Sequence, residues 1–266
     1  MFEFIKAIIL GIVEGLTEFL PISSTGHLII VNDWISFGKD FTQTFDVVIQ
    51  LGAILAAALF FRAKLWPFGK DGIKKDVLDT WSKSILSVVP ALFLGFLLHH
   101  FIEEKLFNPI TVAVALVLGG IILIVVEKKS RTEKITSIAQ MSYQTAFAIG
   151  VIQCLALIPG TSRSAATIVG ALLLGASRVV ATEFSFFLAI PTLLAASAFT
   201  ILKNGFSLTG SQFLILLTGF LTSFFVASLV ISVFMKYIRN KNFVPFGYYR
   251  ILLGLIVLVY SIVKFF

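Results

Sequence analysis

The chain has 266 residues, of which 58% are hydrophobic and only 13% are charged, and its mean hydropathy is +1.00. A soluble domain is closer to half apolar and a quarter charged, so this composition indicates an integral membrane protein. The net charge of +7 does not indicate nucleic-acid binding, because the basic residues mostly lie in short loops between apolar runs, where they orient a chain in the membrane. The composition leaves the oligomeric state open.

Apolar runs close to the roughly 20 residues of a spanning helix recur along the chain, and strand-like alternation is absent. We therefore predict an all-α, polytopic membrane protein with a single membrane domain over residues 1–266. The first segment, about residues 2–20, carries Glu14 and Glu18 and lacks a small-x-small cleavage site, so we expect no cleavable signal peptide. The second begins at Ser23 or Ser24 and fades by residues 34–37, which is too short to span and predicts a re-entrant piece.

Further apolar segments follow in chain order at about residues 44–61, 84–101, 109–126, 140–158, 161–174, 182–202, 212–235 and 246–263. The break at Pro159-Gly160 resembles the earlier break at Pro21, since proline ends or kinks a helix in both places.

The sequence repeats itself at an offset of 139 residues. Gly-Ile-Val-Glu-Gly-Leu at 11–16 matches Gly-Val-Ile-Gln-Cys-Leu at 150–155, and the apolar residues 54–57 match 193–196 at the same offset. We predict two repeats, about residues 1–134 and 135–266, each with a re-entrant helix pair and three transmembrane helices. Because a re-entrant pair gives no net crossing and three spans give one, the second repeat is predicted to be inverted relative to the first.

The basic residues divide unevenly between the two predicted sides of the membrane. Fifteen fall on one side: Arg62, Lys64, Lys70, Lys74, Lys75, Lys83, Lys128, Lys129, Arg131, Lys134, Arg178, Lys236, Arg239, Lys241 and Arg250. Five fall on the other: Lys6, Lys39, Lys105, Lys203 and Lys264. The positive-inside rule makes the richer side cytoplasmic, so both termini and the mouth of the first broken pair are predicted to face outward.

The carboxylates of Glu14 and Glu18 lie four residues apart, on one face of a predicted helix. They are candidates for binding a hard divalent cation, or for one base plus one metal ligand. The alternative is a pair of interfacial glutamates solvated by lipid headgroups. The closeness of Glu18 to the break favours the functional interpretation.

Hydroxyl residues follow the first break at Ser23, Ser24 and Thr25. They could cap the second half-helix, or supply a nucleophile and phosphate contacts at a helix N-terminus. His27, about one turn further, could be a general base or proton relay, or equally a buried histidine bonded to the backbone.

Arg163 lies between two apolar segments, where an arginine needs an anionic partner. Its guanidinium suits bidentate phosphate binding, and the alternative is a structural salt bridge to Glu14 or Glu18. Asp46 and Gln50, one turn apart, either line the same cavity or lie at the interface.

The stretches Glu14-Gly-Leu-Thr-Glu-Phe-Leu-Pro-Ile-Ser-Ser-Thr-Gly-His27 and Pro159-Gly-Thr-Ser-Arg-Ser164 closely resemble the two signature motifs of the undecaprenyl-pyrophosphate phosphatase family, also known for bacitracin resistance. The resemblance covers essentially the whole chain, including residues 44–52. It implies a multi-pass enzyme of the bacterial inner membrane that removes the terminal phosphate of a prenyl pyrophosphate lipid, with a divalent metal, Mg²⁺ or Ca²⁺, as cofactor. The active site is predicted to open to the outer side.

Carried over to this chain, the motifs predict three groups of site residues. The catalytic residues are Glu18, Ser24, His27 and Arg163; the metal ligands are Glu14 and Glu18; the substrate-binding residues are Ser23, Thr25, Gln50, Gly160, Thr161, Ser162 and Ser164. We expect Ser24 to attack phosphorus with help from Glu18 or His27, while Arg163 and the metal hold phosphate.

Two other classes of function compete with a phosphatase. Inverted repeats with broken helices are also a transporter design, so a transporter or flippase of a phosphorylated lipid is the main alternative. A cation channel that uses the glutamates is a second alternative, and the central Arg163 argues against it.

Overall fold

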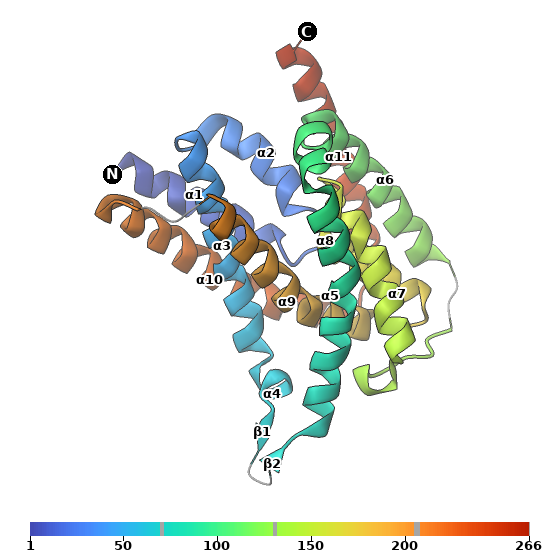
Figure 1. Cartoon of the computed structure of the whole chain (residues 1–266). Coiled ribbons are helices and arrows are strands. Elements are labelled where there is room, and N and C mark those ends of the chain that lie inside the picture. The colour runs from blue at the N-terminus through green and yellow to red at the C-terminus, as the bar shows by residue number, and fades with distance from the viewer. Residues whose placement is uncertain (70–71, 130–131, 205–207, 266) are drawn as a thin grey trace.

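The structure is a computed structural model that describes residues 1–69, 72–129, 132–204 and 208–265, and its long elements are all helices (Figure 1). In chain order they are α1 Phe2–Thr17, α2 Ser24–Ile35, α3 Lys39–Phe60, α4 Arg62–Leu65, α5 Lys75–Phe101, α6 Pro109–Lys128, α7 Tyr143–Gln153, α8 Arg163–Leu173, α9 Arg178–Asn204, α10 Gly210–Ile238 and α11 Val244–Phe265. The strands β1 Phe68–Gly69 and β2 Gly72–Ile73 pair antiparallel between α4 and α5. Short π and 3₁₀ turns cover Ile102–Leu106, Ile138–Gln140 and Cys154–Leu157.

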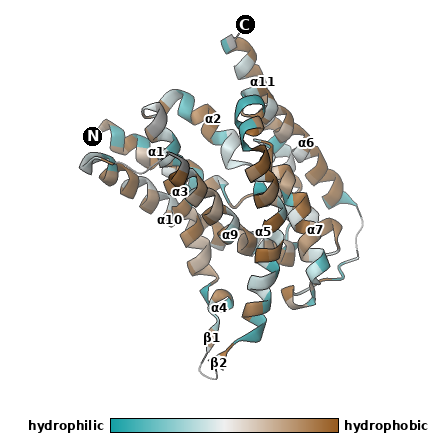
Figure 2. Cartoon of the chain, in the orientation of Figure 1, coloured by the Kyte–Doolittle hydropathy of each residue, from teal (hydrophilic) through white to brown (hydrophobic). Residues whose placement is uncertain are grey.

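Six of the described helices are long and apolar enough to cross a membrane: α3, α5, α6, α9, α10 and α11. The pairs α1–α2 and α7–α8 are made of shorter helices, and the 12 residues of α2 reach only about 18 Å at 1.5 Å per residue. Figure 2 shows apolar residues along most of the helices and polar residues near α4 and at the adjoining end of α5. The prediction of an all-α polytopic membrane protein is therefore confirmed, with six described helices that are able to span a membrane.

The two helix breaks have the same backbone geometry. Ser23 and Ser162 have φ angles of 74° and 71°, in the left-handed region that a non-glycine residue rarely occupies. Each is the N-cap of the next helix, and its side chain accepts a hydrogen bond from the N–H three residues later, on Gly26 and Ala165 respectively. Such a conformation costs about 1–3 kcal/mol and persists only where its surroundings enforce it.

Helices from one half of the chain pack against helices from the other half. Helix α1 packs against α10, while α7 packs against α5, and α6 packs against α11 (Figure 1). Two of the close backbone contacts between the halves are at Gly11 and Gly150, the first residues of the two matching hexapeptides. An added Cβ would lie 2.7 Å from the Gly219 carbonyl oxygen at Gly11, and 2.2 Å from the Ser87 carbonyl oxygen at Gly150. Glycine is required at both positions because two backbones touch there.

Arg250 corrects the predicted charge distribution. It was assigned to the basic membrane surface, but its side chain is fully buried and hydrogen-bonds backbone carbonyls at the helix breaks. The assignment was wrong because α11 begins at Val244 and directs this residue inward, about 1.7 turns into an apolar helix. Fourteen basic residues remain on the predicted basic side against five. Two of the fourteen, Lys70 and Arg131, lie outside the described residues.

We expect Gly150→Ala to destabilise the protein by about 1–3 kcal/mol, since its new methyl group would force α5 and α7 apart. Thermal unfolding in detergent measures the effect. Gly210→Ala is the matched control, because an added Cβ meets nothing within 4 Å at that position. Equal melting temperatures for the two variants would contradict the close α5–α7 approach.

Candidate active site

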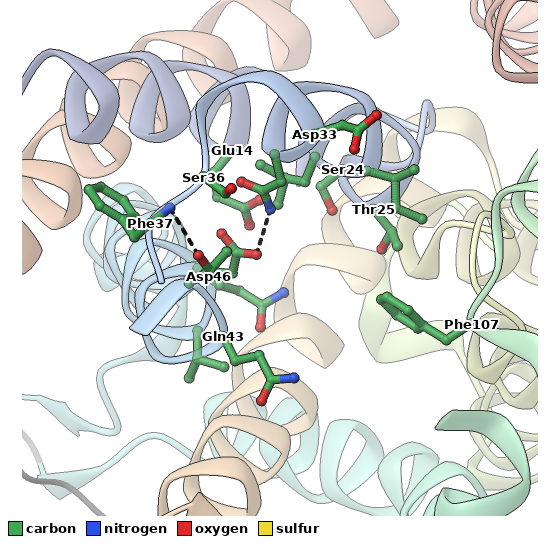
Figure 3. A pocket seen from close by; sticks show the side chains of 15 residues that line it. Glu14, Ser24, Thr25, Asp33, Ser36, Phe37, Gln43, Asp46 and Phe107 are labelled. Carbon is green, nitrogen blue, oxygen red and sulfur yellow. Dashed lines mark hydrogen bonds between the residues drawn. The ribbon is translucent and has the colours of Figure 1, made fainter. Parts of the chain in front are cut away.

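A cavity of about 630 Å³ lies between α1, α2 and α3 (Figure 3). Its lining is Glu14, Ser24, Thr25, Leu28, Ile29, Asn32, Asp33, Ser36, Phe37, Thr42, Gln43, Asp46, Val47, Gln50 and Phe107. The cavity thus brings together Glu14 from α1, Ser24 and Thr25 from α2, and Asp46 and Gln50 from α3. The interpretation that placed Asp46 and Gln50 on one cavity wall agrees with this geometry.

Glu18 links the two breaks at the edge of this cavity. Ser24 Oγ donates a hydrogen bond of 2.7 Å to Glu18 Oε2, and Arg163 Nη2 lies 3.0 Å from Glu18 Oε1. The carboxylate is 6% exposed, so both contacts are shielded from solvent. Glu18 and Arg163 therefore meet although they lie 145 positions apart in the chain. Ser24, the predicted nucleophile, already has a hydrogen-bond acceptor in Glu18.

Residues of α8 and α9 hold the Arg163 side chain in position. Its Nη1 donates to the Ser185 backbone oxygen at 2.9 Å, and Ser185 Oγ in turn accepts from Thr167 Oγ1 at 2.7 Å. The guanidinium carbon lies 5.6 Å from the centre of the Phe19 ring. Arg163 Nε is buried and has no hydrogen-bond partner within the described chain, so one donor remains free. The salt bridge to Glu18, the structural alternative for this residue, is present.

Arg250 binds backbone carbonyls of both breaks. Its Nη1 donates to Pro21 O at 3.4 Å, and its Nη2 donates to Gly160 O at 3.2 Å and Thr161 O at 2.9 Å, as well as to Ala115 O of α6 at 3.3 Å. Gly160 and Thr161, predicted to bind substrate, thus place their carbonyls on an arginine of α11.

Hydroxyl groups at the breaks also have structural partners. Ser164 Oγ donates to Leu20 O across the two breaks at 2.8 Å, and Ser162 Oγ lies 3.0 Å from Ser164 Oγ. Ser23 Oγ caps α2, which leaves Ser24 free to bond Glu18. Among the predicted substrate-binding residues, Thr25 and Gln50 line the cavity. The serines Ser23, Ser162 and Ser164 hold the breaks.

His27 faces away from Ser24. Its Nδ1 lies 2.7 Å from Ser23 O and its Nε2 lies 2.7 Å from Tyr249 Oη, with the two rings stacked. It lines a second cavity of about 460 Å³, with mostly aliphatic residues of α1 and Phe246 of α11. This geometry matches the alternative of a histidine bonded to the backbone, and a proton-transfer role for His27 stays a prediction.

Oxygen atoms that could hold a metal gather near Glu14. Glu14 is 1% exposed, and its Oε1 has no hydrogen-bond partner in the part of the chain that the structure describes. The described residues contain no group of three or more His, Cys, Asp and Glu side chains that could hold a metal ion. A hard cation here would therefore combine carboxylates with amide, hydroxyl, water or substrate oxygens, as Mg²⁺ and Ca²⁺ do.

Sequence reasoning missed three kinds of site residue. Arg250 could have been found, because an arginine several residues inside an apolar segment needs partners. Ser185, Thr167 and Tyr249 carried no such signal, since a hydroxyl in a membrane helix commonly bonds its own helix. Asn32 lies within the predicted re-entrant helix, but its hydrogen bond to Asp46 of α3 depends on how the two helices pack.

Comparison with known proteins extends across most of the chain. The family described as bacitracin resistance protein BacA matches residues 7–256. An undecaprenyl-diphosphatase of Lachnoclostridium phytofermentans is 50% identical, covering 97% of both chains. Undecaprenyl-diphosphatase 1 of Clostridioides difficile is 50% identical over 98% of this chain and 97% of its own. An undecaprenyl-diphosphatase of Enterococcus faecalis is 48% identical over 97% of this chain and 96% of its own.

We expect Arg250→Met to lower the melting temperature in detergent by several degrees, because each buried carbonyl left unpaired costs about 1–3 kcal/mol. Arg250→Lys should retain part of the stability, since an ammonium can still donate to these carbonyls. The control is Lys236→Met, on the exposed face of α10. A melting temperature for Arg250→Met equal to that of the control would remove Arg250 from this structural role.

Proposed function

Because this chain belongs to the bacitracin resistance protein BacA family, we propose that it is an undecaprenyl-diphosphatase, which hydrolyses the terminal phosphate of undecaprenyl pyrophosphate to give undecaprenyl phosphate for cell-wall synthesis. The observation that carries the proposal is the hydrogen bond of 2.7 Å from Ser24 Oγ to the buried carboxylate of Glu18, with Arg163 on the same carboxylate. A hydroxyl beside a base and an arginine is an arrangement for phosphoryl transfer.

In the reaction we propose, Ser24 Oγ attacks the terminal phosphorus and Glu18 accepts the proton. The Oγ–P bond forms as the bond from phosphorus to the bridging oxygen breaks, and undecaprenyl phosphate leaves. Water then hydrolyses the phosphoserine and releases inorganic phosphate. Glu18 suits the role of base better than His27, because both ring nitrogens of His27 are engaged away from Ser24.

Arg163 binds the transferred phosphate in this proposal. Ser185 and Phe19 orient the guanidinium, and its Nε has no partner in the residues described. A positioned guanidinium stabilises charge that develops on phosphate oxygens without having to reorganise during the reaction.

We further propose that a divalent cation, Mg²⁺ or Ca²⁺, is the cofactor, with Glu14 among its ligands. When bound, such a cation neutralises phosphate charge and acts as a Lewis acid. Glu14 has a free, buried carboxylate oxygen on the cavity wall. Glu18, also predicted as a ligand, is already shared by Ser24 and Arg163, which favours its role as base.

We also propose that the two halves of the chain are inverted repeats in the bacterial inner membrane, with the site open to the outer side. The equal geometry at Ser23 and Ser162 and the exchanged α1–α10 and α7–α5 contacts support the repeat. The excess of basic residues at the α4–β1–β2 end supports an orientation with that end in the cytoplasm.

Purified protein in detergent should release phosphate from undecaprenyl pyrophosphate, and chelator should stop the release. We expect Glu18→Gln and Arg163→Ala to reduce kcat by about 10²–10³-fold or more while the protein still inserts and purifies. Near-normal turnover in either variant would remove that residue from the mechanism. No release by the wild-type protein with added Mg²⁺ or Ca²⁺ would contradict the proposed activity.

Ser24→Ala tests the nucleophile separately from the helix cap, because Ser23 caps α2. We expect loss of turnover with a melting temperature close to the wild type, measured on the same preparation. Ser23→Ala should instead lower stability by about 1 kcal/mol through loss of the cap. A loss of only a few-fold in Ser24→Ala would point to water as the attacking group.

A further inference from the structure

We infer that Asp46 and Asn32 complete a divalent-cation site with Glu14, in the cavity between α1, α2 and α3, and that Glu18 is not one of its ligands. The inference deepens the proposed function, on which its catalytic role rests.

Three buried oxygen atoms on this cavity have no hydrogen-bond partner among the described residues: Glu14 Oε1, Asn32 Oδ1 and Asp46 Oδ1. Glu14 is 1% exposed, so water cannot readily solvate its free oxygen. Buried polar atoms normally have partners, and an unsatisfied carboxylate oxygen in a protein interior is costly. Three such atoms from three helices around one cavity point to a missing common partner.

A hydrogen bond already fixes two of the three side chains relative to each other. Asn32 Nδ2 donates to Asp46 Oδ2 at 2.9 Å, which leaves the Oδ1 atom of each residue free (Figure 3). Figure 3 shows Glu14, Ser24 and Asp46 directed into the same cavity. The site is therefore built before the cation arrives, with the Asn32 amide group orienting the Asp46 carboxylate.

The charges around the cavity favour a cation. Arg163 forms its ion pair with Glu18, whereas neither Glu14 nor Asp46 has an ion-pair partner within the described residues. Glu14 lies close enough to Glu18 and Asp46 for their negative charges to act on it, while the positive charge of Arg163 acts in the opposite sense. A bound divalent cation stabilises two carboxylates that repel each other, and it also gives their free oxygens a partner.

Asp33 lines the same cavity but is excluded from the site by its contacts. Its carboxylate is bonded by Lys264 and by Tyr260 Oη, both on α11. Two carboxylates and one amide oxygen leave the remaining positions of a hard cation for water and phosphate oxygens. Ser24, the proposed nucleophile, and Gln50 line the same cavity. A phosphate bound to the cation would therefore lie beside Ser24.

The test measures metal binding without substrate. Chelator-stripped protein in detergent is titrated with Mn²⁺, and free Mn²⁺ is followed by electron paramagnetic resonance. We expect Glu14→Gln and Asp46→Asn each to raise the Mn²⁺ dissociation constant about tenfold or more. The control Asp33→Asn, which removes a carboxylate from the same cavity, should change it by less than about threefold. Added Ca²⁺ should displace the bound Mn²⁺ from the wild type.

The variant Glu18→Gln distinguishes this metal site from one formed by Glu14 and Glu18. We expect it to bind Mn²⁺ within about threefold of the wild type while it loses phosphate release. A tenfold loss of Mn²⁺ binding in Glu18→Gln, with Asp46→Asn unaffected, would overturn the inference.

Asn32→Asp provides a gain of function. A third carboxylate should tighten Ca²⁺ binding, and without metal it should lower the melting temperature, because it repels Asp46. We therefore expect a larger Ca²⁺-induced rise in melting temperature than in the wild type. No increase in that rise would count against Asn32 as a ligand. If the wild type binds Mn²⁺ as described but releases no phosphate, the proposed function fails and the cation site stands.

Discussion

Both helix breaks depend on hydrogen bonds from the guanidinium of Arg250. A helix that breaks at membrane depth leaves carbonyl groups without partners, and hydrocarbon offers them none. Arg250 donates to Pro21 at the first break and to Gly160 and Thr161 at the second, from a helix that belongs to neither. Its charge is spread over several carbonyl dipoles, and Gly119 leaves the space that the guanidinium fills. The last spanning helix thereby sets the distance between the two broken pairs.

The chemistry of the site follows from that distance. With the breaks held together, Arg163 from the second reaches Glu18 beside the first, and Ser24 reaches the other oxygen of the same carboxylate. Strained backbone at Ser23 and Ser162 turns the chain so that each following helix starts at the breaks. Two broken helix pairs, held side by side, thus bring the Ser24 hydroxyl, the Glu18 carboxylate and the Arg163 guanidinium together.

Much of this arrangement could be predicted from the sequence because lipid imposes simple rules. Six apolar helices of spanning length, two short broken pairs and the meeting of Glu18, Ser24 and Arg163 follow from apolar length and from polar groups that lipid does not tolerate. The direction of side chains could not be predicted. His27 lies one turn from Ser24 but faces Tyr249, and Arg250 looked interfacial until the start and rotation of α11 were known. Helix rotation depends on packing between distant segments, which no local pattern contains.

The double engagement of Glu18 makes the substrate-free site self-contained. Its acid and its guanidinium satisfy each other, so the protein can hold a buried charge pair in the bilayer while it waits for lipid. In the proposed reaction, a phosphate that takes over the Arg163 donor would release one oxygen of Glu18 at the step in which Ser24 gives up its proton. Binding of the phosphate and freeing of the base would then be one exchange of partners, and a lipid without a phosphate would leave the Arg163–Glu18 ion pair intact.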